Sequence, residues 1–252
     1  MARVVIATTD SNAQVNGSGI ERMRAAGIDV AVGLLGAESR RLNGAFFAFH
    51  QKYRPYITLK WAQSSDGFID HVRAGHGALK VSDNISRIAV HKLRASHDAI
   101  LVGTRTALLD NPSLDVRFWS GRSPLRAVID RKGVLPHELH LFDGSQPTVV
   151  FTENPKNCFG KNIEQVALRE DVPVVEQITG WLHLRKINSL LVEGGSSTLQ
   201  SFIDAGMWDS VRVETNPSLV VTEGVAAPCL VNGVKVSEEK CGGNIVSFFD
   251  RV

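Results

Sequence analysis

The stretch that decides the fold runs from Leu190 to Leu199 and reads LLVEGGSSTL. A short apolar run leads into two glycines, small hydroxyl residues and an amphipathic pattern, which is typical of a buried strand followed by a helix. Gly194 and Gly195 let backbone approach a ligand closely, and the free N–H groups of a helix start attract phosphate. Glu193 lies where the strand ends, the position at which open α/β sheets bind ligands. A plain strand-to-helix turn with a serine N-cap is the alternative.

The same alternation of apolar runs and helical patterns extends over most of the 252 residues. Continuous β-branched runs suit strands that helices cover on both faces, so we predict an α/β layered fold with a mostly parallel sheet. Turn signals at Asn232-Gly233 and Gly242-Gly243-Asn244 predict antiparallel pairing near the end of the chain. The predicted strands are 4–7, 28–32, 56–61, 99–102, 125–129, 148–151, 190–192 and 211–213. The predicted helices are 20–26, 38–53, 84–96, 163–168, 179–186 and 197–205.

A domain boundary is predicted at Tyr53-Arg54-Pro55, because proline disfavours helix for the residue ahead of it. The first 53 residues hold two strands and two helices, which is too little to bury both faces of a sheet. We therefore interpret residues 1–53 as a fragment whose sheet needs to pack against another part of the protein or a partner. Gly17-Ser18-Gly19 precedes a helix, but Arg22 occupies the third glycine position of a dinucleotide fingerprint, which favours a simple tight turn.

Composition excludes several classes of function. A formal net charge of +2 does not indicate nucleic acid or a membrane surface as the partner. The sequence has no apolar run of about 18 residues, so no transmembrane helix is predicted. The first ten residues lack the features of a signal peptide. Cys158, Cys229 and Cys241 have no C-x-x-C spacing, and the histidines have no ligand spacing. We expect reduced thiols, no metal site and a cytoplasmic protein.

Two further patterns point to a ligand site. Lys60 lies inside an apolar run and either reaches to the rim of the sheet or faces a site. In residues 102–117 a predicted strand again ends in glycine, and hydroxyl residues and Asp110 follow before a proline turn. A capped loop is the simpler explanation of this pattern. Arg94 and Arg117 supply guanidinium groups that suit a phosphate ester, whereas either arginine alone is typical of a solvated surface.

In their order along the chain, these motifs together resemble the reductase half of the bifunctional riboflavin-biosynthesis deaminase/reductase family. The stretches that carry the resemblance are 54–60, 64–67, 91–95, 99–103, 110–112, residue 117 and 191–195. The resemblance covers residues 54–252 and implies a dihydrofolate-reductase-like α/β domain, with a mostly parallel sheet, that forms a homodimer. Residues 1–53 resemble the C-terminal end of the family's cytidine-deaminase-like domain. The zinc motifs of such a deaminase, H-x-E and P-C-x-x-C, are absent, so this chain is not expected to deaminate.

The resemblance implies a reaction and a set of site residues. Hydride from NADPH reduces the ribosyl group of 5-amino-6-(5-phosphoribosylamino)uracil, a phosphorylated pyrimidine, to a ribityl group. Lys60 and Glu193 are expected to polarise or protonate the ribose hydroxyls, with Asp110 ordering the pocket. The residues expected to bind the cofactor are Ala62, Thr106, Asp110, Gly195, Ser196, Ser197, Thr198, Leu199, Gln200 and Ser201. The residues expected to bind substrate are Ser82, Arg94, Leu114, Arg117 and Glu193, with the two arginines on the 5′-phosphate.

The sequence departs from the family pattern at the lid of the site. Ala78 and Lys80 stand where many relatives have a serine and a tryptophan, so Lys80 is placed to meet a phosphate, and Ser82 is the better candidate for a polar contact. Another dihydrofolate-reductase-like enzyme and a silent nucleotide-binding module remain alternatives. The choice between NADPH and NADH also stays open, with residues 130–132 as the hypothesis for a 2′-phosphate contact.

Overall fold

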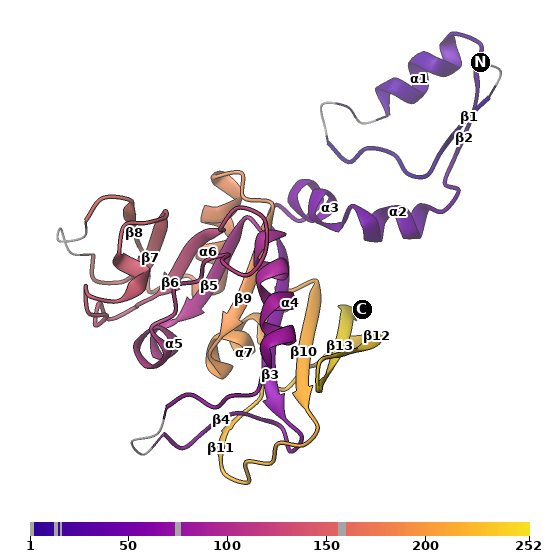
Figure 1. Ribbon diagram of the computed structural model, residues 1–252. Coiled ribbons are helices and arrows are strands. Elements are labelled where there is room, and N and C mark those ends of the chain that lie inside the picture. The colour runs from indigo at the N-terminus through magenta and orange to yellow at the C-terminus, as the bar shows by residue number, and fades with distance from the viewer. Residues whose placement is uncertain (1–2, 13–14, 16, 74–76, 156–159) are drawn as a thin grey trace.

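A nine-stranded sheet organises most of this computed structural model, which describes residues 3–12, 15, 17–73, 77–155 and 160–252 (Figure 1). The strand order is β12-β13-β10-β3-β9-β5-β6-β7-β8, and the strands from β10 to β8 are parallel, whereas β13 and β12 add an antiparallel edge. The bounds are β3 Tyr56–Ser64, β5 Ala99–Gly103, β6 Leu125–Ile129, β7 Thr148–Thr152, β8 Ile163–Ala167, β9 Ser189–Gly194, β10 Ser210–Asn216, β12 Gly233–Cys241 and β13 Asn244–Arg251.

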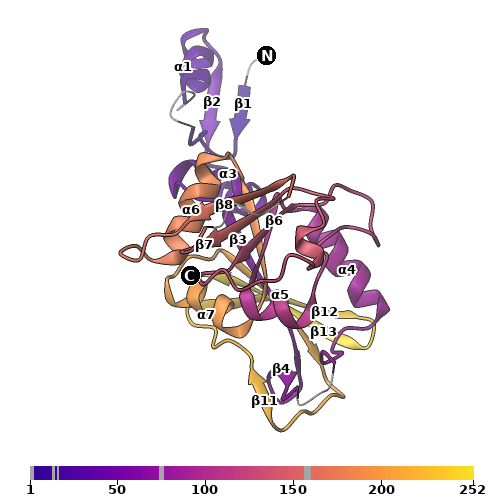
Figure 2. The ribbon, with the colours of Figure 1, turned by 90° about the vertical axis from the view of Figure 1, so that its left-hand side faces the viewer.

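Helices cover both faces of this sheet (Figure 2). Helices α4 (Asn84–Ala95) and α5 (Thr104–Asp110) lie on one face, and α6 (Val174–Leu184) and α7 (Ser196–Asp204) lie on the other. Successive residues of β5 alternate between two apolar cores: Ala99 and Leu101 pack with α6 and α7, while Ile100 and Val102 pack on the α5 side. A 3-10 turn at His140–Phe142 completes the second core. The predicted α/β class with a mostly parallel sheet is confirmed.

A small two-stranded arm extends beyond the carboxyl end of β3. Strand β4 (Phe68–His71) pairs antiparallel with β11 (Gly224–Ala226). Residues 77–83 lead into α4, whose N-cap is Asp83, with its carboxylate accepting from the Ser86 backbone N–H at 2.8 Å. The sequence analysis did not predict this arm, because its strands are too short to show a period.

Residues 3–53, called the N-terminal lobe below, stand apart from residues 54–252, called the body (Figure 1). The lobe contains a parallel pair of strands, β1 (Arg3–Ile6) and β2 (Asp29–Val32). Its helices are α1 (Ser18–Ala25), α2 (Gly36–Leu42) and α3 (Gly44–Gln51). Neither α1 nor α2 contains a buried residue among those described, whereas α3 buries Phe47 and Ala48 and contacts β3. The ring of Phe49 on α3 also lies 4.4 Å from the ring of His183 on α6.

A buried ion cluster joins the lobe to the body. Both oxygens of Asp209 accept from the Arg54 guanidinium at 2.5 and 3.0 Å, and the Lys52 ammonium lies 2.6 Å away. The backbone N–H of Ile57 donates to the same carboxylate at 2.9 Å. The chain turns here through Tyr53, whose φ is 53°.

Two predicted helices differ from the structure, and one predicted residue lies outside it. The single helix predicted over 38–53 is two helices, because the chain leaves helical geometry at Asn43, where φ is −106° and ψ is 29°. The helix predicted over 163–168 is wrong: these residues form the edge strand β8, paired in parallel with β7. Gly17 has a φ of 80° at the start of α1, which agrees with a tight turn. Cys158 lies outside the described residues.

Candidate functional site

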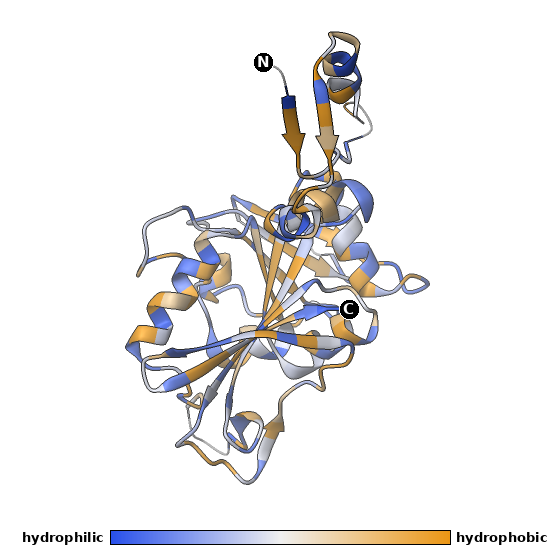
Figure 3. Cartoon of the chain, turned by 90° about the vertical axis from the view of Figure 1, so that its right-hand side faces the viewer, coloured by the Kyte–Doolittle hydropathy of each residue, from blue (hydrophilic) through white to orange (hydrophobic). Residues whose placement is uncertain are grey.

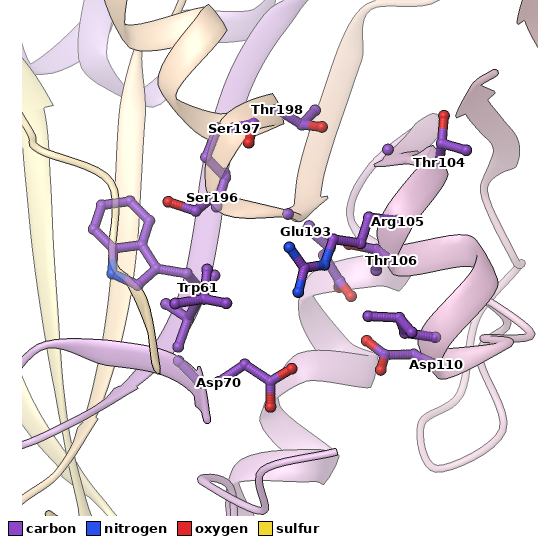
Figure 4. Close-up of a pocket in the computed structure, with 18 of the residues that line it drawn as sticks. Trp61, Asp70, Thr104, Arg105, Thr106, Asp110, Glu193, Ser196, Ser197 and Thr198 are labelled. Carbon is purple, nitrogen blue, oxygen red and sulfur yellow. The ribbon is translucent and has the colours of Figure 1, made fainter. Parts of the chain in front are cut away.

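A cavity of about 700 Å³ opens at the carboxyl ends of the central strands (Figure 4). Strands β9 and β5 are neighbours, yet the helices that follow them, α7 and α5, leave toward opposite faces of the sheet. Such a reversal leaves a crevice at the strand ends, which is where open α/β sheets bind ligands. The arm, Arg73 and residues 79–82 form the outer wall of the cavity.

Two glycines allow α5 and α7 to begin close together at this crevice. A Cβ on Gly103 would lie 2.3 Å from the hydroxyl oxygen of Thr198, and a Cβ on Gly194 would lie 2.9 Å from a methyl of Thr106. The φ of Gly195 is 74°, a conformation that side chains other than glycine rarely adopt. The stretch that the sequence analysis singled out is therefore shaped for close approach of the two helix starts, and Thr106 and Thr198 face the cavity (Figure 4).

An ionised carboxylate lies at the floor of the cavity. Glu193 accepts from Arg94 Nε at 2.9 Å and from Arg94 Nη2 at 2.7 Å, a bidentate ion pair. Burial raises the pKa of Glu193, but Arg94 and then Lys60 lower it further, so its pKa lies below the usual value. Burial lowers the pKa of Lys60, while the nearby Glu193 opposes this shift. The site thus pairs an acceptor carboxylate with an ammonium group that releases its proton more readily than a free lysine.

A second carboxylate, Asp110, is tied to the arm. Arg73 donates from Nη2 to Asp110 at 2.6 Å, from Nε to Asp70 at 2.5 Å, and from Nη1 to the carbonyl of Leu109 at 3.1 Å. Figure 4 shows Asp70 and Asp110 facing each other across the cavity. Arg73 therefore links the arm to the C-terminal end of α5 at the edge of the site.

The far end of the cavity is basic. Asp130 is buried and accepts from the backbone N–H groups of Val134 and Leu135 at 3.1 and 2.9 Å, which fixes the turn after β6. Arg131 and Lys132 follow on this turn and line the cavity, and Arg131 also pairs with Glu153 at 2.5 Å. The start of α7 opens into the same cavity. Cations and free helix N–H groups together suit a phosphorylated ligand.

The structure brings together most of the predicted site residues. Those that line the cavity are Lys60, Ala62, Ser82, Thr106, Asp110, Glu193, Gly195, Ser196, Ser197, Thr198 and Leu199. Gln200 and Ser201 do not line it: the Gln200 amide contacts Asp204 and the backbone of Cys229, and Ser201 donates to the Thr198 carbonyl. Leu114 lies in the core, with a φ of 50°.

The two arginines assigned to the substrate phosphate lie beside the cavity rather than on its wall. Arg94 donates to the Asp115 carbonyl at 3.2 Å, and Arg117 forms an ion pair with the Asp115 carboxylate. Arg117 keeps about half of its side chain exposed, but the Arg94 guanidinium is engaged by Glu193. Their role in holding phosphate stays a prediction.

Several residues on the wall were missed by the sequence analysis. Trp61, Asp70, Arg73, Arg87 and Arg105 all line the cavity. Asp70 and Arg73 belong to the arm and the residues after it, which have no recognisable motif. Arg105 follows the glycine at the end of β5 and was the one detectable case, since a cation at the first turn after a strand end faces the ligand crevice.

Other kinds of site find no support in the described part of the chain. No group of three or more His, Cys, Asp or Glu residues there is placed to hold a metal ion. Cys229 and Cys241 are free thiols. None of the described helices is both long and apolar enough to cross a membrane.

Comparison with known proteins identifies the family. The RibD C-terminal domain family matches residues 55–240. The riboflavin biosynthesis protein RibD of Aquifex aeolicus is 34% identical, over 99% of this chain and 72% of its own length. That of Bacillus amyloliquefaciens is 35% identical, over 92% of this chain and 63% of its own length. This chain thus spans about two thirds of the length of these relatives.

Solved structures agree with the sequence comparison. The diaminohydroxyphosphoribosylaminopyrimidine deaminase/5-amino-6-(5-phosphoribosylamino)uracil reductase of Thermotoga maritima is 31% identical and has a TM-score of 0.87, covering 100% of this chain and 72% of its own. Acinetobacter baumannii RibD, 22% identical with a TM-score of 0.84 over 99% of this chain and 73% of its own, shares the fold. The chain belongs to the RibD C-terminal domain family.

Proposed function

We propose that this chain reduces the ribosyl group of 5-amino-6-(5-phosphoribosylamino)uracil to a ribityl group with hydride from NADPH. The observation that carries the proposal is the meeting of Lys60 and Glu193 at the floor of a cavity whose far end is basic. The family relationship and the Thermotoga maritima enzyme, which is named for this reductase activity, support the same substrate.

The residues present fit a nicotinamide dinucleotide. Gly103 and Gly194 keep the crevice between the two helix starts free of side chains, and the start of α7 offers N–H groups to a pyrophosphate. Arg131 and Lys132 lie at the far end of the cavity, where a 2′-phosphate would favour NADPH over NADH. When bound, the cofactor supplies the hydride that adds to C1′ of the sugar.

The protein's own residues manage the proton and the position of the sugar. Opening of the ribose ring breaks the bond between C1′ and its ring oxygen, and that oxygen takes up a proton. The Lys60 ammonium is the proton donor in this proposal, because burial already lowers its pKa. Glu193 stays ionised beside Arg94, accepts hydrogen bonds from the ribose hydroxyls and orients C1′ toward the hydride.

The test is the loss of absorbance of NADPH on mixing with the deaminated pyrimidine, with the ribitylamino product identified by mass. Glu193→Gln is expected to lower turnover at least 100-fold while leaving the Kd for NADPH within about threefold, because the group acts on substrate. Glu239→Gln, an exposed change on β12, is the control. Equal turnover of Glu193→Gln and the control would remove Glu193 from the mechanism, and no NADPH binding would sink the proposal.

We further infer that residues 1–53 are the C-terminal remnant of a cytidine-deaminase-like domain. Its parallel pair β1–β2 is covered by few side chains, and Val5, Val32, Leu34, Leu35 and Leu42 are exposed (Figure 3). Parallel strands are normally buried on both faces, so a lobe of this kind is incomplete by itself. Deaminase assays of this chain with added zinc are expected to show no activity.

A further inference from the structure

Strand β10 places two buried charges next to Lys60 that the proposed mechanism does not use. In the parallel register of β10 and β3, Arg212 lies opposite Lys60 and Glu214 lies opposite Ala62. Residues two apart on a strand point to the same face, so Arg212, Glu214 and Lys60 share one face of the sheet. Both residues of β10 are almost fully buried, at 4% and 0% exposure.

The Glu214 carboxylate is firmly held in place. Asn244 Nδ2 donates to Glu214 Oε1 at 2.6 Å and to the Val81 carbonyl at 3.1 Å, and Val81 lines the cavity. Arg212 Nη1 lies 3.4 Å from Glu214 Oε2, while Arg212 Nη2 is buried without a hydrogen-bond partner among the described residues. The Arg212 contact is long, and after burial the charge of Lys60 has the largest influence on the pKa of Glu214, ahead of its hydrogen bonds to Ser82, Asn244 and Ser86.

The buried charges alternate in sign across neighbouring elements. Arg94 on α4 pairs with Glu193 on β9, Lys60 follows on β3, and β10 supplies the second carboxylate and the second guanidinium. Lys60 lies between two carboxylates and forms no direct ion pair among the described residues. Glu193 is already paired with Arg94, so the second carboxylate, Glu214, is a further source of negative charge that favours the protonated form of Lys60.

We propose that Glu214 is a positioning residue that acts through Lys60 and keeps its ammonium group charged beside the sugar site. The proposal deepens the proposed function and rests on it only for the use of the proton, not for the electrostatic arrangement. Burial lowers the pKa of Lys60, whereas Glu193 and then Glu214 raise it, and Arg212 and Arg94 lower it. Removing Glu214 should therefore lower the pKa of Lys60 further, and removing Arg212 should raise it.

Other charged groups surround the same cavity, and they stay the same when Glu214 or Arg212 is replaced. His91 on α4 lies near Glu193 and its pKa is lowered, first by burial and then by Arg94. The further charged residues on the cavity wall are Asp70, Arg73, Lys80, Arg87, Arg105, Asp110, Asp130, Arg131 and Lys132.

The experiment measures the titration of Lys60 in the ligand-free protein by NMR of ¹³Cε-labelled lysine, with the signal assigned from a Lys60→Arg variant. Glu214→Gln is expected to lower the titration midpoint by on the order of one pH unit, and Arg212→Met to raise it. A merely structural role would move both midpoints in the same direction or neither, and either result would overturn the proposal. Glu214→Asp should return the midpoint toward that of the unchanged protein.

A second readout follows the enzyme. The alkaline limb of kcat against pH should shift to lower pH in Glu214→Gln, with the Kd for NADPH unchanged and Glu239→Gln behaving like the unchanged protein. An alkaline limb that stays in place in Glu214→Gln would overturn the positioning role. If the unchanged protein does not turn over the pyrimidine at all, the proposed function fails, whereas opposite NMR shifts in the two variants would still establish the electrostatic arrangement.

Discussion

The N-terminal lobe and the body both contain parallel strands followed by helices, but the body buries its large apolar side chains whereas the lobe leaves many of them exposed. In the body, Leu182 on α6 is fully buried, whereas Leu42 on α2 of the lobe is 87% exposed. The body covers its sheet on both faces with two cores, while the lobe has one sheet of two strands and none of its described residues belongs to either core. The difference shows that the alternation of strands and helices does not by itself make a self-contained domain.

The largest expected effect comes from a matched pair of leucines. Leu182→Ala is expected to lower the free energy of unfolding by about 2–5 kcal/mol, because it leaves a cavity in the core, and Leu42→Ala should leave it nearly unchanged. Urea denaturation followed by circular dichroism measures both. A loss from Leu42→Ala as large as that from Leu182→Ala would mean that the lobe is covered in solution and would break the comparison.

The junction between the two regions gives the next largest effect. Asp209→Asn removes the charge that Arg54 and Lys52 share, and breaking such a buried pair is expected to lower the free energy of unfolding by about 3 kcal/mol. Asp171→Asn, which alters an exposed pair with Arg169, is the control and should have no measurable effect.

The same carboxylate predicts a pH dependence. Burial raises the pKa of Asp209, but Arg54 and Lys52 lower it further, so its folded pKa lies below the ordinary value. The stabilisation is thus fully present above the unfolded pKa of about 3.9 and is lost as the pH falls through the lowered folded pKa. Asp209→Asn should show a flatter loss of stability in acid than the unchanged protein, and parallel curves would contradict the assignment.

A pair of glycines tests how tightly each region is packed. Gly194→Ala places a Cβ 2.9 Å from Thr106 and is expected to lower the free energy of unfolding by about 1–3 kcal/mol. Nothing lies within 4 Å of a Cβ on Gly19 of α1, so Gly19→Ala should be neutral or stabilising by up to about 1 kcal/mol. Thermal melts of the two variants, compared at equal concentration, give the contrast; a neutral Gly194→Ala would show that the crevice is looser than described.

The smallest effect on folding is expected on the exposed face of the lobe. Leu34→Ser combined with Leu42→Ser should leave the free energy of unfolding within about 0.5 kcal/mol of the unchanged protein, because both side chains are mostly exposed. Sedimentation velocity should show less self-association through this face. Clear destabilisation would instead indicate that a partner copy covers these leucines.

Much of the body was predictable from local patterns. The buried strands 99–102, 125–129 and 148–151 were found because their residues, apart from Arg126, are apolar or β-branched, and the structure places them side by side in β5, β6 and β7. The edge strand β8 was mistaken for a helix because IEQVA alternates poorly, and its pairing with β7 overrides the local preference. Helix α5 was missed because it is short and follows glycine directly.

Site residues could be predicted where glycines mark the end of a strand. They could not be predicted where the pairing register of two strands decides which side chains are neighbours. Glu193 followed from its place before two glycines. Glu214 carries no motif, and its proximity to Lys60 depends on the pairing of β10 with β3, which no local pattern contains. Arg73 reaches Asp110 only because the arm folds back over α5.

The pairing of the central strand has a consequence for the order of events during synthesis. Strand β3 lies between β9 and β10, which emerge from the ribosome more than a hundred residues later, and Asn244 bonds Val81 across 163 residues. Until those late segments arrive, the apolar strand that carries Lys60 has no neighbours in the sheet, a state in which chaperones and proteases compete with folding. The completed cavity is therefore a late product of translation, and a chain that stalls before residue 244 cannot hold it.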